Sequence, residues 1–189
     1  MRAAVFYATR QGQTRRIAEH IAAELRRRRV DVDVRNVKDD PIVDWSRYRV
    51  VCVAASVHIG RHEPEMTTFV RQNRTHLERL DAAFLSVSLS EAGVENPDAP
   101  IERRRESAAD VARMIDKFIE DTGWKPEHTL AVAGALVYSR YNVIVRFLMK
   151  LIARQAGAST DTSRDYEFTD WHTVDRFIGD LVPATGRQP

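Results

Sequence analysis

Polar residues that could hold a phosphate group stand together near the start of the chain, in the segment TRQGQT from Thr9 to Thr14. An apolar run at residues 3–8 precedes the segment and has the length of a buried strand, and a helix is predicted to open at Thr14. A loop that joins a strand to a helix directs several backbone N–H groups and the positive end of the helix at one point, where a phosphate is stabilised. Thr9 and Thr14 add hydroxyl groups, and Gly12 lets the backbone approach closely. The alternative is a structural turn in which Thr14 only caps the helix.

Two common phosphate motifs are absent from this loop. The P-loop requires a Lys, and the first Lys of the chain is Lys38; the dinucleotide motif GxGxxG requires three glycines, and the loop has only Gly12. The remaining pattern, TRQGQT after the first strand, resembles the phosphate loop of the flavodoxin family. In that family loop amides and Thr or Ser hydroxyls hold the 5′-phosphate of FMN.

Further along the chain, apolar runs alternate with amphipathic helical segments. The predicted strands are residues 3–8, 30–34, 49–55, 82–87 and 129–136. The predicted helices are residues 14–29, 63–77, 107–121 and 171–182, the last with Asp170 as its cap. Residues 88–105 contain Gly93 and two prolines and show no period, which predicts a long loop. The alternation predicts an α/β, flavodoxin-like fold: a doubly wound five-stranded parallel sheet of order 2-1-3-4-5 with helices on both faces. The strictly alternating strand at 30–34 belongs near its edge.

Three polar loops should meet at one edge of this sheet. They follow the first, third and fourth strands and comprise Thr9–Thr14, Ser56–His62 and Ser86–Ser90. In open parallel sheets, ligands bind beyond the carboxyl ends of the strands, where the strand order reverses. None of these polar residues is needed to fill a core, so their convergence predicts a nucleotide-type site.

The composition favours a single domain over residues 1–182, with a tail at 183–189. A chain of 189 residues needs no disulfide or metal for stability, and the six histidines lack ligand spacing, so no metal site is predicted. The lone Cys52 is expected to be a buried core residue, a usage that suits a reducing cytosol. With no signal pattern and no apolar run of the ~20 residues that a spanning helix requires, a cytoplasmic location is expected. The formal net charge of +2 is too small to favour nucleic-acid binding.

A basic segment at about residues 137–157 is not required by a five-stranded fold. It has no acidic residue between Arg140 and Arg154, and its apolar positions form one wide helical stripe. The polar positions repeat every four residues opposite that stripe: Asn142, Arg146, Lys150 and Arg154. Two interpretations remain open. The segment is either a surface helix packed on the sheet, or a helix that lies on an anionic membrane or lines the entry for an apolar reactant.

Five segments together resemble the menaquinone-dependent protoporphyrinogen IX dehydrogenase family, a long-chain relative of the flavodoxins. They are TRQGQT, ASVHIGRH at 55–62, AFLSV at 83–87, VAGALVYSRY at 132–141 and TDW at 169–171. The resemblance implies that the protein binds FMN, oxidises protoporphyrinogen IX in haem biosynthesis and passes electrons to a membrane quinone. It also implies peripheral contact with an anionic membrane, at the inner face of the cell membrane, and no nucleic-acid partner.

The resemblance assigns the FMN site to the three loops. The residues expected to contact FMN are Thr9, Arg10, Gln11, Gly12, Gln13, Thr14, Ser56, Val57, His58, Ile59, Gly60, Ser86, Val87, Ser88 and Leu89. The first loop would hold the phosphate, and Gly60 would leave room for a peptide flip beside the ring. His58 is a candidate for proton transfer, and the alternative is a loop residue that touches solvent or the ring edge. Cations that could contact the substrate propionates or the membrane are Arg61, Arg140, Arg146, Lys150 and Arg154.

Three other functions remain open. The first is an electron-carrier flavodoxin, although such carriers are usually strongly acidic and this chain is slightly basic. The second is an FMN-dependent NAD(P)H:quinone reductase in which the basic segment serves the quinone alone. The third is a scaffold without flavin, and the hydroxyl-rich loops argue against it.

Overall fold

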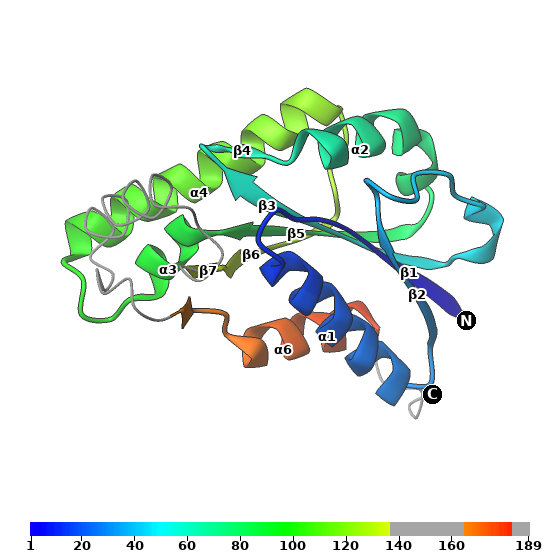
Figure 1. The fold of residues 1–189 in the computed structure, drawn as a ribbon, viewed down its shortest axis with the longest axis horizontal. Helices are drawn as coiled ribbons and strands as arrows, with labels where there is room; N and C mark the ends of the chain where they lie inside the picture. Colours follow the sequence, from blue (N-terminus) through cyan, green and yellow to red (C-terminus); the bar gives the residue numbers. More distant parts are fainter. Residues whose placement is uncertain (137–164, 183–189) are drawn as a thin grey trace.

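The computed structural model describes residues 1–136 and 165–182, which form a parallel sheet with helices on both faces (Figure 1). The parallel strands are β1 (Arg2–Ala8), β2 (Asp31–Asn36), β3 (Val50–His58), β5 (Asp81–Ser88) and β6 (His128–Ala133). They pair in the order β2-β1-β3-β5-β6. Counted over the parallel strands, this is the predicted order 2-1-3-4-5, so the flavodoxin-like fold class is confirmed.

Two helical layers cover the sheet. One face carries α1 (Gln13–Arg27) and α6 (Trp171–Leu181), and the other carries α2 (Pro64–Leu77) and α4 (Ile101–Thr122) (Figure 1). Successive β1 side chains alternate between the layers. Ala3 and Val5 pack in the α1–α6 core, and Ala4 and Phe6 pack in the α2–α4 core. A strand covered on both faces needs an apolar residue at every position, which explains the continuous apolar runs of the central strands.

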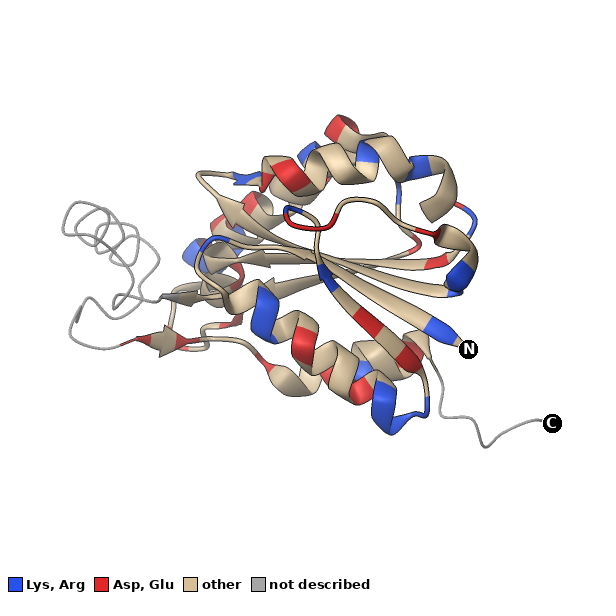
Figure 2. Ribbon diagram, turned by 45° about the vertical axis from the view of Figure 1, so that its right-hand side comes forward, with Lys and Arg blue, Asp and Glu red and all other residues tan. Residues whose placement is uncertain are grey.

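Charged residues are concentrated on the helices, on the turns and along the edge strand β2, whereas the central strands are largely free of them (Figure 2). In β2, Asp31 is exposed and Val32 is buried, which confirms that this alternating strand lies at the sheet edge. Cys52 in β3 is fully buried, and burial raises the pKa of its thiol to about 12. It is therefore an unreactive core residue, as predicted.

The segment 88–105 is not the long loop that its glycine and prolines predicted. It contains α3 (Leu89–Glu95) and the first turns of α4, which begins at Ile101 rather than at residue 107. The hydroxyl of Ser88 caps α3 by accepting a hydrogen bond from the N–H of Glu91 at 3.2 Å. The prediction was wrong because a seven-residue helix is too short to show a period. The opening turn of α4 also carries charged residues in place of an apolar stripe.

The fifth strand is shorter than predicted. β6 ends at Ala133, and after Gly134 the chain forms β7 (Ala135–Leu136), which pairs antiparallel with β8 (Tyr166–Glu167). The predicted cap of α6 is confirmed, since Asp170 accepts hydrogen bonds from the backbone N–H groups of His172 at 2.9 Å and Thr173 at 3.2 Å. The basic segment at 137–157, with Arg140, Arg146, Lys150 and Arg154, lies outside the described residues. Within 1–136 and 165–182, no helix combines the length and the apolar character needed to cross a bilayer.

Candidate functional site

The loops after β1, β3 and β5 meet at the carboxyl ends of the strands, so their predicted convergence is confirmed. Together with the end of β6 they enclose a hollow, called here the cradle. It is lined by Thr9, Gln11, Gln13, Thr14, Ser56, Val57, His58, Val87, Ser88, Leu89, Gly134 and Ala135. The enclosed space is about 80 Å³, below the roughly 300–1,000 Å³ of pockets that surround most of a ligand. A nucleotide held in the cradle would therefore be enclosed at one end and extend outward at the other.

Gly12 shapes the loop after β1. Its φ of 96° lies in the left-handed region that glycine adopts without steric cost, and its N–H donates to the Thr9 hydroxyl oxygen at 3.0 Å. Gly12 is also the cap of α1, which begins at Gln13. The alternative in which Thr14 caps this helix is therefore wrong, and the helix opens one residue earlier than predicted.

Thr14 lies in the first turn of α1 with its side chain fully buried. Its Oγ1 has no hydrogen-bond partner, which costs roughly 1–3 kcal/mol when the hydroxyl stays unpaired. The first turn of α1 has neither a side-chain cap nor an acidic residue of its own, so its first backbone N–H groups have no side-chain acceptor within the helix. An unpaired hydroxyl beside an uncapped helix N-terminus matches the donor set that a phosphate requires.

Gln13 fixes the first loop to the C-terminal part of the domain. Its side-chain amide nitrogen donates to Glu167 at 2.7 Å and to the hydroxyl of Thr169 at 2.9 Å. The Thr169 hydroxyl donates in turn to the carbonyl of Ala133, at the end of β6, at 2.7 Å. The side chain of Gln13 therefore positions the loop, and Gln13 is also one of the residues that line the cradle.

Arg10 does not line the cradle. Its Nε lies 2.9 Å from the Oε2 atom of Glu63, a carboxylate that is only 3% exposed. The hydroxyl of Ser56 donates to the same carboxylate at 3.1 Å. Glu63, which the sequence patterns did not single out, thus joins the first loop to the end of β3 and the start of α2. The only signal in the sequence was an acidic residue next to Pro64, and that was interpreted as a helix start.

The segment from Ser56 to His62 is a hairpin rather than an open loop. β3 continues to His58 and pairs antiparallel with β4 (Arg61–His62). The two connecting residues, Ile59 and Gly60, have φ values of 50° and 70°, as in a type I′ turn. A Cβ atom placed on Gly60 would meet no neighbour, so the backbone conformation alone favours glycine there. Ile59 is a β-branched residue in a strained conformation, and its side chain is 86% exposed.

Ser86 faces away from the cradle. Its hydroxyl oxygen lies 2.9 Å from Nε2 of His62, on the α2–α4 side of the sheet, because successive residues of β5 point to opposite faces. Val87 and Ser88, which follow it, do line the cradle. His62 packs against the rings of Phe84 and Phe118, with ring centroids 5.2 and 4.9 Å away, and burial lowers the pKa of its imidazole to about 4.

The other predicted residues divide between two sides of the hairpin. His58 lines the cradle and also a larger neighbouring pocket, whereas Ile59 and Arg61 line that neighbouring pocket and not the cradle. Gly134 and Ala135 line the cradle but were not predicted. The signal for them was available, because the carboxyl end of the fifth strand lies at the same edge of the sheet as the other loops.

Comparisons with known proteins place the chain in a family. The model of the flavodoxin domain matches residues 4–163. Protoporphyrinogen IX dehydrogenase (quinone) of Escherichia coli strain K12 is 33% identical over 187 residues, covering 99% of this chain and 98% of that protein. A protein of the same name from Leishmania major is 29% identical, covering 94% of this chain and 73% of the relative.

Solved structures support the fold. A short-chain flavodoxin associated with a bacterial microcompartment superimposes with a TM-score of 0.54 at 13% identity, covering 96% of both chains. Flavodoxin 1 from Bacillus cereus gives a TM-score of 0.50 at 15% identity, covering 96% of this chain and 97% of that one. The chain therefore belongs to the flavodoxin-domain family, and within it to the family of the protoporphyrinogen IX dehydrogenases.

Proposed function

We propose that this protein is an FMN-dependent oxidoreductase that oxidises a porphyrinogen and delivers the electrons to a quinone. The observation that carries the proposal is the unpaired, fully buried hydroxyl of Thr14 at the uncapped start of α1. A phosphate oxygen there would satisfy the hydroxyl, and the positive helix end would stabilise the phosphate charge. The near full-length relationship to the E. coli dehydrogenase supports the choice of a porphyrinogen and a quinone as reactants.

The residues of the cradle suit an FMN held at its phosphate end. Thr9, Thr14 and the first backbone N–H groups of α1 would bind the phosphate. The hairpin from Ser56 to His62 and the segment Val87–Leu89 would border the flavin ring on its two sides. Gln11, Gly134 and Ala135 would close the base of the cradle between them. When bound, FMN supplies the redox chemistry, and the protein positions it and tunes its surroundings.

His58 is proposed to exchange the proton that accompanies oxidation of the substrate. Among the residues that line the cradle, it is the one whose side chain belongs to a type that exchanges protons near neutral pH. It also lines the neighbouring pocket, so it lies where the two hollows adjoin. That position would bring the imidazole close to a reactant that approaches the bound FMN from the neighbouring pocket.

The basic side chains Arg146, Lys150 and Arg154 are proposed to hold the protein at an anionic membrane, where the quinone is found. Each cation close to such a surface contributes about 1 kcal/mol. Arg140 is proposed to lie close to the substrate. These assignments concern residues outside the described part of the chain, and they are supported by the charge pattern of the sequence.

An anaerobic assay tests the proposed function. FMN-loaded protein is mixed with protoporphyrinogen and a soluble menaquinone analogue, and formation of porphyrin is followed by its fluorescence. A matched reaction contains NADH in place of the porphyrinogen, and quinone reduction is followed by absorbance. Porphyrin formation that depends on both FMN and quinone supports the proposal. Quinone reduction by NADH without porphyrinogen oxidation would contradict it and favour a quinone reductase.

A further inference from the structure

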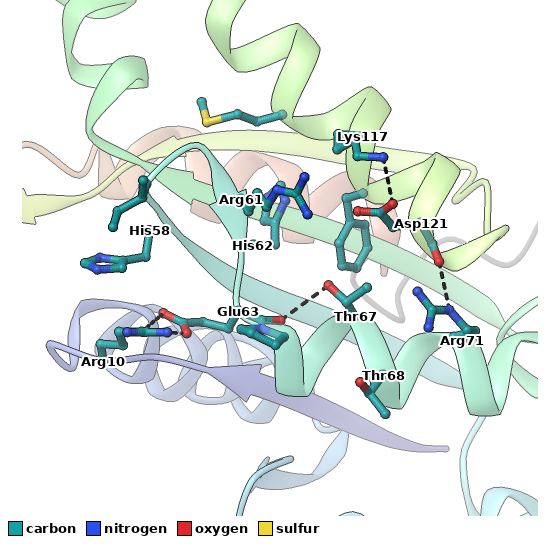
Figure 3. A pocket seen from close by; sticks show the side chains of 14 residues that line it. Arg10, His58, Arg61, His62, Glu63, Thr67, Thr68, Arg71, Lys117 and Asp121 are labelled. Atoms are coloured by element: carbon teal, nitrogen blue, oxygen red, sulfur yellow. Dashed lines mark hydrogen bonds and ion pairs between the residues drawn. The ribbon is translucent and has the colours of Figure 1, made fainter.

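A second and larger pocket lies on the far side of the hairpin from the cradle, between β4, α2 and α4 (Figure 3). We call it the hairpin pocket. Its volume is about 680 Å³, within the range of pockets that bind small molecules. Met114 and Phe118 of α4 give it a buried apolar wall, and the exposed side chain of Ile59 lies at its rim. Such a surface suits the apolar part of a large ring.

Cations from three elements surround this apolar wall. Arg61 comes from β4, Arg71 from α2 and Lys117 from α4 (Figure 3). The two carboxylates of the pocket are already paired: Glu63 with Arg10, and Asp121 with Lys117 at 2.8 Å. The hydrogen bond from Lys117 is also the main reason that the pKa of the Asp121 carboxyl is lowered.

The two arginines are not matched by a carboxylate at short range. Within the described part of the chain, no Asp or Glu oxygen lies within 4.0 Å of the guanidinium of Arg61 or of Arg71; their charges act on Asp121 only at longer range, where they help to lower the pKa of its carboxyl. Arg71 donates only its Nε to the backbone carbonyl of Asp121, at 2.9 Å, which leaves its terminal nitrogens for another acceptor. A guanidinium with free terminal nitrogens binds a carboxylate through two parallel hydrogen bonds.

The hairpin pocket and the cradle adjoin at His58, which lines both. We propose that the hairpin pocket binds the carboxylate-bearing part of the substrate, with Arg61 and Arg71 as its anion-binding residues and the Met114–Phe118 wall contacting the ring. A substrate held in this way approaches the cradle past the end of β3, where His58 stands beside the turn of the hairpin. The identity of the ligand as a porphyrinogen rests on the proposed function, whereas binding of a flat amphiphilic dicarboxylate can be measured by itself.

The test uses protoporphyrin IX, the oxidised product, as the probe. FMN-loaded protein is titrated in a detergent-containing buffer, and porphyrin fluorescence gives the dissociation constant. The dimethyl ester of protoporphyrin, which has the ring without the carboxylates, is titrated in parallel. The double variant Arg61→Gln, Arg71→Gln should weaken binding of protoporphyrin IX about tenfold, because two solvent-accessible ion pairs are lost. Binding of the ester and of FMN should not change.

The control is the double variant Arg103→Gln, Arg113→Gln. Like the test variant, it removes two positive charges. Both come from exposed arginines of α4 that line neither the cradle nor the hairpin pocket. It should bind protoporphyrin IX like the wild type. Equal affinity of the Arg61/Arg71 variant and the wild type would overturn the proposal, as would an equal loss in the control variant. Displacement of protoporphyrin IX by NADPH through the same two arginines would also overturn it, because the pocket would then bind a nucleotide.

The assay of turnover separates this inference from the proposed function. If the wild type forms porphyrin and the Arg61/Arg71 variant has a higher KM for the porphyrinogen at unchanged kcat, the proposed function and the assignment of the hairpin pocket are both supported. If the wild type forms porphyrin and the variant leaves KM unchanged, the assignment of the pocket fails and the function stands. If the wild type forms no porphyrin but binds protoporphyrin IX through the two arginines, the function fails and the pocket stands. Circular dichroism and FMN affinity of each variant show whether it has folded.

Discussion

The Nε of Arg10 lies 2.9 Å from a carboxylate oxygen of Glu63, across 53 positions of the sequence. Arg10 belongs to the loop that would hold the phosphate, and Glu63 stands at the start of α2, directly after the hairpin that would border the flavin ring. The carboxylate is nearly inaccessible to solvent, and it also accepts a hydrogen bond from Ser56. The pair therefore fixes the relative position of two sides of the cradle without lining it.

Replacing Glu63 should loosen the cradle. Glu63→Ala leaves Arg10 and Ser56 without their common partner, so the free energy of unfolding should fall by about 1–3 kcal/mol. We expect FMN affinity to fall as well, because the two loops are no longer held together. Urea denaturation and FMN titration measure these effects. The control is Glu19→Ala, which removes the exposed ion pair with Arg15 and should cost less than about 0.5 kcal/mol. Equal effects of the two variants would show that the buried pair has no special role.

Replacing Thr14 by Val should change stability and affinity in opposite directions. The variant removes a buried hydroxyl that has no partner, so the free energy of unfolding without FMN should stay unchanged or rise. FMN binding should weaken by about 1–3 kcal/mol through the lost hydrogen bond to the phosphate. Thr122→Val is the control, because the Thr122 hydroxyl is buried but donates to the carbonyl of Phe118 at 2.7 Å. It should lower stability and leave FMN affinity intact. If Thr14→Val binds FMN as tightly as the wild type, the phosphate does not contact this hydroxyl.

Relieving the strain at Ile59 should stabilise the protein. Asparagine adopts the left-handed conformation of a type I′ turn more readily than isoleucine does, so Ile59→Asn should raise the free energy of unfolding by about 1 kcal/mol. Ile42→Asn serves as the control, since Ile42 is 85% exposed and is not among the described residues with positive φ. It should change stability by less than about 0.5 kcal/mol. Thermal denaturation of both variants measures the change in stability. A destabilised Ile59→Asn variant would mean that the exposed isoleucine side chain makes favourable contacts.

His62 should make the protein less stable below neutral pH. Its folded-state pKa of about 4 lies below the ordinary value of about 6.5, so the unfolded chain binds the additional proton between these values. Stability is therefore fully present above about pH 6.5 and falls as the pH is lowered towards 4, by up to about 3 kcal/mol. Glu95, whose pKa burial raises to about 7, has the opposite dependence, because its folded form favours the proton.

The difference between wild type and His62→Gln isolates the histidine contribution from that of Glu95. Glutamine retains a polar group near Ser86 and does not titrate, so the variant should lose less stability than the wild type between pH 7 and 4. His128→Gln is the control, because His128 is exposed at the start of β6. Urea denaturation at several pH values gives the free energy of unfolding of each protein as a function of pH. Parallel curves for wild type and His62→Gln would show that His62 does not stay neutral in the folded protein.

Neutralising Arg146, Lys150 and Arg154 together should release the protein from anionic vesicles. If each cation contributes about 1 kcal/mol, the three together contribute about 3 kcal/mol, and binding to phosphatidylserine-containing vesicles should fall by about a hundredfold. A triple variant at Arg79, Arg103 and Arg113, which are exposed cations of the α2–α4 layer, removes the same charge elsewhere. Vesicle sedimentation compares the two. An undiminished association after neutralising the basic segment would favour its packing on the sheet.

The fold could be predicted from the sequence because a strand that is buried on both faces is apolar at every position, and such a run is easily recognised. The runs at residues 3–8, 49–55 and 82–87 had to be apolar at every position, and their order followed from the crossover rules. The convergence of the three loops followed from the fold. The helix at Leu89–Glu95 could not be predicted, because it is too short to show a period and contains Gly93.

The side-chain details of the site depended on tertiary contacts that no local pattern encodes. Arg10 lies in the predicted phosphate loop, yet the buried Glu63 draws its guanidinium away from the cradle. Ser86 had the right position in the sequence but faces the other side of β5, where it contacts His62. Counting strand alternation back from Val87 would have revealed this orientation. No count along the chain would have paired residues 10 and 63.

The antiparallel contact between β7 and β8 has a consequence for how such proteins diversify. The chain departs at Leu136 and returns at Tyr166, directly opposite in the ladder, so the intervening stretch begins and ends at one spot on the domain. Closing so short a gap has a small entropic penalty, and a brief turn could replace the whole stretch without moving the strands. Evolution could therefore graft, lengthen or exchange an appendage at this junction while the parallel sheet and its helices stayed the same.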